Sequence, residues 1–86
     1  MEELIKLVEK IGWEATYYGD DEGDTVNAYP YGKGDGVVFY TIYEYPDTFT
    51  VMRSRLTGDD ISDVVLGDWK TEKDVIKAIK ADTRKK

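Results

Sequence analysis

Apolar residues along the chain follow two different periods, and the changes of period predict a helix, a series of strands and a second helix. Residues 2–11 place apolar side chains three or four positions apart, with charged side chains between them, which is typical of an amphipathic helix. Gly12 is suited to the left-handed conformation that ends many helices, with Trp13 folding back as its apolar partner. Residues 71–82 repeat the helical spacing, with Thr71 as N-cap and Asp74 completing an approximate capping box.

Between these helices, short stretches that alternate apolar and polar residues are separated by turn residues, which predicts strands. We expect strands at residues 13–18, 25–29, 37–45, 49–56 and 62–69. In the first strand, Trp13, Ala15 and Tyr17 are expected to point inward. Pro30 lacks an amide proton, so the second strand should end there or lie at a sheet edge.

The turn at residues 46–47 determines how the third and fourth predicted strands pair, because proline presets the backbone for the second position of a type I turn. Tyr40 then pairs with Arg53. One face of this hairpin holds Phe39 and Tyr43, and we expect that face to be the core. The other face mixes arginine with aromatic and aliphatic groups, so it is expected to be partly solvated.

These elements predict an α+β fold in two layers. We expect an N-terminal helix, an antiparallel meander of four to five strands and a C-terminal helix, with both helices on one face of the sheet. Residues 1–82 should form a single domain, and residues 83–86 a frayed basic tail. A domain of this size buries only about 60–65% of its unfolded surface, so any site must be shallow or shared with a partner.

Composition narrows the chemistry that is available. The chain has no cysteine and no histidine, which excludes disulfide frameworks, thiol nucleophiles, zinc hydrolases and Ser–His–Asp sites. We therefore expect no enzymatic activity, no cofactor and no metal. The N-terminus is acidic and no long apolar run is present, so we expect no signal peptide, no membrane association and a cytoplasmic location.

Charge is divided unevenly along the chain. Residues 1–36 hold nine carboxylates and three lysines, whereas residues 37–86 hold nine carboxylates and nine Lys or Arg side chains. The formal net charge of −6 therefore belongs to the first part of the chain. Such a distribution affects solubility and the choice of partner rather than the fold.

Three candidate sites match their motifs only in part. Asp20, Glu22 and Asp24 alternate as in the first half of a calcium-binding loop, but Thr25 stands where such a loop needs its glycine, so calcium binding is not expected. The glycines of residues 32–36 precede a strand instead of the helix that a phosphate-binding loop requires. Adjacent carboxylates in glycine-flanked turns are normally solvated, and acid–base catalysis needs a desolvated pocket.

Two features bear on nucleic-acid binding. Arg53 and Arg55 could contact phosphates from an open sheet face. The segment 66–72, in which a strand, Gly67, Trp69 and Thr71 precede a helix, resembles the strand–helix junction of integrase arm-type DNA-binding domains. That resemblance implies DNA binding by a basic sheet. Because the net charge of this chain is −6, direct nucleic-acid binding is not expected.

The tyrosines and the acidic loop of residues 19–24 together suggest a protein-binding surface. The chain has seven tyrosines, more than a thin core needs, and this residue is enriched at recognition surfaces. We expect tyrosines to provide anchor area and carboxylates to provide steering. The predicted surface consists of Tyr18, Asp20, Asp21, Glu22, Asp24, Tyr29 and Tyr31.

Two alternatives to a generic protein-binding module stay open. In size and composition the chain is similar to phage-encoded inhibitors of host nucleic-acid enzymes, in which carboxylates imitate the phosphates of DNA. That resemblance implies a viral DNA mimic whose partner is a nucleic-acid-handling enzyme. The other alternative is a structural domain that associates with itself, as a homodimer, through a strand edge or the tyrosine-bearing face.

Overall fold

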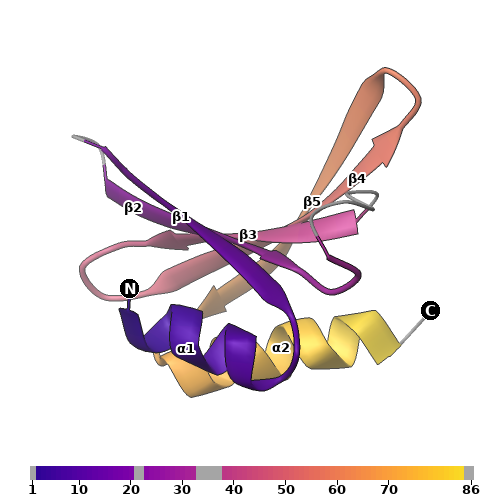
Figure 1. The fold of residues 1–86 in the computed structure, drawn as a ribbon. Coiled ribbons are helices and arrows are strands. Elements are labelled where there is room, and N and C mark those ends of the chain that lie inside the picture. Colours follow the sequence, from indigo (N-terminus) through magenta and orange to yellow (C-terminus); the bar gives the residue numbers. More distant parts are fainter. Residues whose placement is uncertain (1, 21–22, 33–37, 85–86) are drawn as a thin grey trace.

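The computed structural model describes residues 2–20, 23–32 and 38–84, and of Asp20 and Thr57 it describes the backbone only. In chain order the elements are α1 (Glu2–Lys10), β1 (Glu14–Asp20), β2 (Gly23–Tyr29), β3 (Val38–Glu44), β4 (Phe49–Thr57), β5 (Asp60–Trp69) and α2 (Glu72–Arg84) (Figure 1). Helix α2 continues past the predicted domain boundary at residue 82, and residues 85–86 of the predicted tail lie outside the described residues. No helix in the described ranges is long and apolar enough to cross a membrane.

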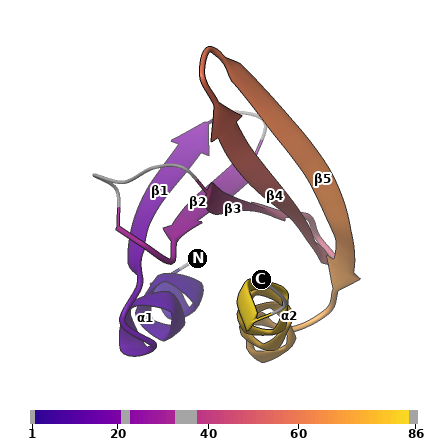
Figure 2. The same cartoon turned by 90° about the vertical axis from the view of Figure 1, so that its right-hand side faces the viewer.

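The strands form one antiparallel sheet in the order β1-β2-β3-β4-β5, so each strand pairs with its neighbours in the sequence. Helix α1 packs on β1 and β2, helix α2 packs on β4 and β5, and the helices contact each other. Both helices lie on the same face of the sheet (Figure 2). The predicted two-layer α+β fold is confirmed. We call the helix-covered side of the sheet the inner face and the opposite side the outer face.

The end of α1 and the start of α2 both show the capping interactions that the sequence predicted. Gly12 has a φ of 88°, and the N–H of Trp13 donates to the carbonyl of Val8 at 3.3 Å. This is the C-terminal cap with a left-handed glycine that was expected for α1. At the start of α2 the N–H of Asp74 donates to the Thr71 hydroxyl at 3.2 Å, as an N-cap should.

The predicted pairing of β3 with β4 is confirmed, but the predicted core face is wrong. Tyr40 pairs with Arg53, as expected. However, Tyr40 and Ile42 are fully buried on the inner face, whereas Phe39 and Tyr43 lie on the outer face and are only partly buried. Turn chemistry determines register but not which side is covered, and here the helices cover the side with Tyr40.

The helices complete the core from the other layer. Leu4 and Val8 of α1 and Val75 and Ile79 of α2 have no exposed surface. Each helix therefore presents an apolar stripe to the sheet, as its spacing predicted. The core also includes Val26, Ala28, Tyr40, Ile42, Phe49, Val51 and Ile76.

Trp13, Ala15 and Tyr17 were predicted to point inward, and they lie on the inner face but are buried to different extents. Trp13 and Ala15 pack against the core. Tyr17 lies on the same face but is 47% exposed, and its hydroxyl donates to Asp24 Oδ1 at 2.6 Å. The exposed end of β1 therefore uses this tyrosine for a hydrogen bond across the β1–β2 hairpin.

Candidate protein-binding surface

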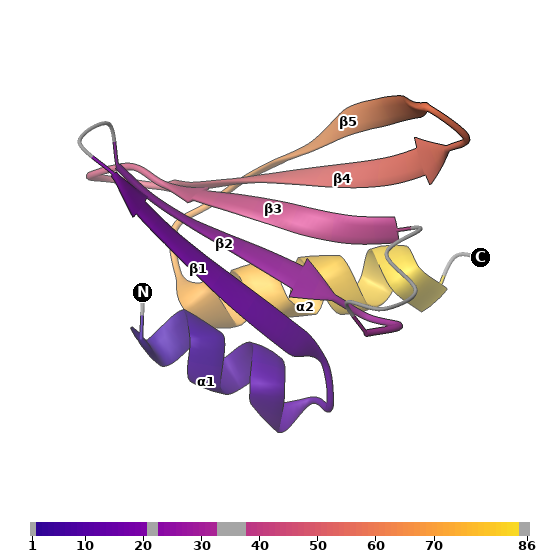
Figure 3. The ribbon, with the colours of Figure 1, turned by 45° about the horizontal axis from the view of Figure 1, so that its top comes forward.

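The outer face of the sheet has no helix or strand over it among the described residues (Figure 3). Strand alternation places large side chains there: Tyr18, Tyr29, Phe39, Tyr43, Met52, Leu56, Ile61 and Val65. Ile61 is 60% exposed and Val65 is 61% exposed. Apolar side chains of this size on one uncovered face are typical of a surface that contacts another molecule.

The part of the outer face on β4 and β5 has a regular order, and we call it the β4–β5 strip. It consists of four cross-strand pairs, in order Thr50–Asp68, Met52–Val65, Ser54–Asp63 and Leu56–Ile61. Apolar pairs thus alternate with pairs of a hydroxyl and a carboxylate. A β-bulge between Val51 and Met52 interrupts the ladder without disturbing this order.

The carboxylates of the strip are held in place by the neighbouring strand. Ser54 donates to Asp63 Oδ1 at 2.6 Å, and Thr50 donates to Asp68 Oδ1 at 2.6 Å. Hydrogen bonds to charged acceptors are shorter and stronger than neutral ones, so they orient both side chains. The turn of this hairpin rises away from both helices (Figure 1).

Charge on the outer face is of one sign among the residues that the structure describes. Its carboxylates are Glu14 on β1 and Asp63 and Asp68 on β5, the two edge strands of the sheet. No described Lys or Arg lies on this face, because Arg53 and Arg55 alternate onto the inner face. The outer face therefore has an uncharged centre and acidic edges.

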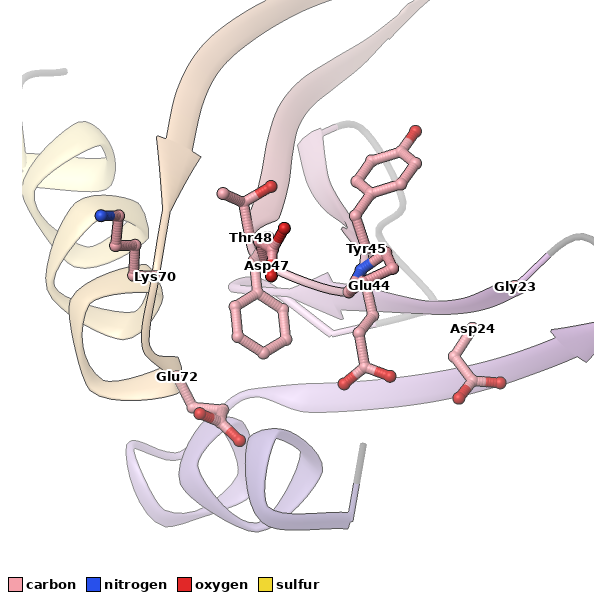
Figure 4. Close-up of a pocket in the computed structure, with 10 residues that line it drawn as sticks. Gly23, Asp24, Glu44, Tyr45, Asp47, Thr48, Lys70 and Glu72 are labelled. Atoms are coloured by element: carbon pink, nitrogen blue, oxygen red, sulfur yellow. The ribbon is translucent and has the colours of Figure 1, made fainter.

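A second feature is an acidic hollow at the end of the molecule where α2 begins. Asp24, Glu44, Asp47 and Glu72 line it, together with Lys70. Figure 4 shows that Glu72 comes from the start of α2, whereas Asp24 and Glu44 come from neighbouring strands. The fold thus brings carboxylates from the later part of the chain beside Asp24.

The structure separates the residues of the predicted surface. Tyr18 pairs with Thr25 and Tyr29 pairs with Glu14, so both tyrosines are on the outer face but about 13 Å apart along β2. Tyr31, which is 52% exposed, follows the far end of β2. Asp24 is at the loop end of the same strand. Asp21, Glu22 and the side chain of Asp20 lie outside the described residues.

Tyr40 is the site of the clearest electrostatic effect in the structure, and it lies inside the molecule. Its hydroxyl donates to Asp82 Oδ2 at 2.6 Å and lies 3.0 Å from Thr83 Oγ1. Asp82 also accepts from Arg53 Nη1 at 2.8 Å. Burial raises the pKa of Tyr40 to about 12, with a smaller contribution from the hydrogen bond to Asp82. This network joins the end of α2 to the sheet.

The aliphatic members of the outer face were missed at the level of sequence. The face predicted to be the core, which holds Phe39 and Tyr43, also carries Met52 and Leu56, and in the structure it is the outer face. Ile61 and Val65 are four positions apart in the sequence, and this spacing places both on one face of a strand.

In the described part of the chain, no group of three or more potential ligands is arranged to hold a metal ion.

Comparisons of this chain with protein-family models, with curated proteins and with solved structures found no match.

Proposed function

We propose that this protein is a non-enzymatic binding module that recognises another protein through the outer face of its sheet. The observation that carries the proposal is the exposure of Leu56, Ile61 and Val65 on a face that no described helix covers. Exposed large apolar side chains flanked by polar groups are a common composition of a protein interface.

The predicted tyrosines support the same surface. Tyr18 and Tyr29 lie on the outer face, and Tyr29 packs against Phe39 with ring centroids 5.6 Å apart. This contact fixes the ring orientations before binding and so reduces the entropy lost on association. The negative charge of residues 20–24 would add long-range attraction for a basic partner.

The experiment uses two neighbouring valines that point to opposite sides of β5. Tagged wild-type protein, Val65→Ser and Val64→Ser are used for affinity capture from a lysate, and captured proteins are identified by mass spectrometry. Val65 is on the outer face and Val64, which is 47% exposed, is not. We expect Val65→Ser to lose a captured protein that wild type and Val64→Ser retain. Equal capture by all three proteins would contradict the proposal, and circular dichroism checks that both variants fold.

DNA mimicry is a second candidate, favoured by the acidic hollow. Its carboxylates come from four segments of the chain and could occupy a basic groove in a nucleic-acid enzyme. Mimicry would be supported over outer-face binding if Glu44→Lys and Glu72→Lys lose the captured protein and Val65→Ser retains it. Added nucleic acid should also displace that protein. Such capture should also fall steeply with salt.

A further inference from the structure

The β4–β5 strip selects a particular kind of partner, and this inference rests on the proposed function. Along β4 the outward side chains are Thr50, Met52, Ser54 and Leu56, so a new cross-strand pair occurs every second residue. That spacing is about 6.7 Å. Asp63 and Asp68 are exposed, and each is oriented by a hydroxyl of β4. Apolar and acidic positions therefore alternate along the strip, at a regular interval on β4 and with one extra residue between Asp68 and Val65 on β5.

Covering these carboxylates requires cations that this face does not provide. A carboxylate removed from water without a cationic partner is strongly destabilising, and the described part of the outer face holds no Lys or Arg. Two copies of the chain packed through this face would bring acidic edges together, with no neutralising Lys or Arg from the part of the face that the structure describes. A second copy is thus a poor occupant, whereas a basic segment of another protein satisfies both kinds of position.

The spacing also favours an extended occupant over a helical one. In an extended segment, alternate side chains on one face are about 6.7 Å apart, which matches the strip. In an α-helix, residues four apart advance about 6 Å and rotate about 40° around the axis, so successive contacts move out of line. A helix keeps its side chains in line only by alternating steps of three and four residues, which advances about 5.2 Å per contact and does not match the spacing of the strip.

We infer that the strip binds an extended segment of another protein in which Lys or Arg alternates with large apolar residues at every second position. The basic side chains would lie over Asp68 and Asp63, and the apolar ones over the Met52–Val65 and Leu56–Ile61 pairs. Charge-assisted contacts would set the register of the segment and the apolar contacts would supply most of the affinity.

The test is selection from a displayed library of random linear peptides against the whole protein. Recovered peptides are labelled, and fluorescence anisotropy measures their affinity for wild type, Asp63→Asn with Asp68→Asn, and Asp59→Asn with Asp60→Asn. Both double variants remove two negative charges, but Asp59 and Asp60 lie at the hairpin turn and off the strip. The pair of variants thus separates a local contact from a general effect of net charge.

We expect peptides with Lys or Arg alternating with apolar residues. Removing the two strip carboxylates should weaken their binding about 5- to 30-fold, and the turn variant should change it by less than about 2-fold. Recovered peptides that need Val65 but lack this alternation would overturn the inference and leave the proposed function standing. Peptides that bind Asp63→Asn with Asp68→Asn as tightly as they bind wild type would have the same consequence. Failure to recover any peptide sensitive to Val65→Ser would overturn the inference, whereas equal protein capture by wild type, Val65→Ser and Val64→Ser would overturn the proposed function as well.

Light scattering of the protein alone provides a second, independent result. We expect the monomer mass. A dimer that Val65→Ser dissociates would overturn the inference, because a second copy would then occupy the outer face.

Discussion

Removing a single hydroxyl group, by Tyr40→Phe, tests how the end of α2 is held to the sheet. The hydroxyl is buried, donates to Asp82 Oδ2 at 2.6 Å and lies 3.0 Å from Thr83 Oγ1. Phenylalanine retains the ring, which stacks on Trp13 with centroids 5.7 Å apart. The substitution therefore removes the polar contact and leaves the apolar packing in place.

The expected loss follows from the type of hydrogen bond. A hydrogen bond to a charged group contributes about 1.5–3 kcal/mol to the free energy of unfolding. Asp82 keeps its ion pair with Arg53 Nη1 at 2.8 Å, so the carboxylate is not left unpaired and the loss should be near the middle of that range, about 2 kcal/mol. With a urea m-value of about 1–1.5 kcal/mol/M for a small domain, the unfolding midpoint should fall by about 1.3–2 M.

Urea unfolding followed by circular dichroism measures this change. Tyr45→Phe is the matched control, because Tyr45 is 53% exposed and the same atom is removed. The control should alter the free energy of unfolding by less than about 0.5 kcal/mol. If Tyr40→Phe also changes it by less than about 0.5 kcal/mol, the network does not hold α2 to the sheet and the reasoning is refuted.

Two further changes follow from the same structure. Because the pKa of Tyr40 is raised from 10.0 to about 12, the folded state holds this proton more tightly than the unfolded state. The part of the free energy of unfolding that comes from this pKa difference should be complete below pH 10 and lost as the pH rises towards 12. Urea unfolding midpoints measured across this pH range should therefore fall less in Tyr40→Phe than in wild type. Gly67→Ala should lower the free energy of unfolding by about 1–3 kcal/mol, because Gly67 has a φ of 146° and an added Cβ would lie 3.3 Å from the Trp69 ring. Gly58→Ala, at a φ of 63° with no atom within 4 Å of the added Cβ, should cost less in thermal unfolding, and an equal cost would contradict the steric argument.

Local chemistry explains the parts of the fold that could be predicted. The sequence predicted the order of helices and strands, the C-terminal cap at Gly12, the cap at Thr71 and the pairing of Tyr40 with Arg53. Each depends on residues close together in the chain or joined by a short turn, so neighbouring side chains suffice to specify it. The extension of β5 back to Asp60 was missed because charged turn residues there resemble a loop.

The orientation of the sheet could not be predicted in the same way. Both faces of the β3–β4 hairpin carry aromatic or aliphatic side chains, so alternation alone did not distinguish the core face. The core face was decided by where the two helices pack. Arg53 is accommodated on that face because Asp82 of α2 accepts its hydrogen bonds, and these residues are far apart in the sequence.

The candidate site likewise depends partly on composition and partly on the tertiary structure. Composition by itself determined the absence of histidine and cysteine, the net charge of −6 and the surplus of tyrosine. Only the tertiary structure placed Ile61 and Val65 on an uncovered face and gathered Glu44 and Glu72 beside the acidic end of β2. The physical reason is that residue types and local backbone preferences are properties of short segments, whereas burial and charge proximity depend on which distant segments the core brings together.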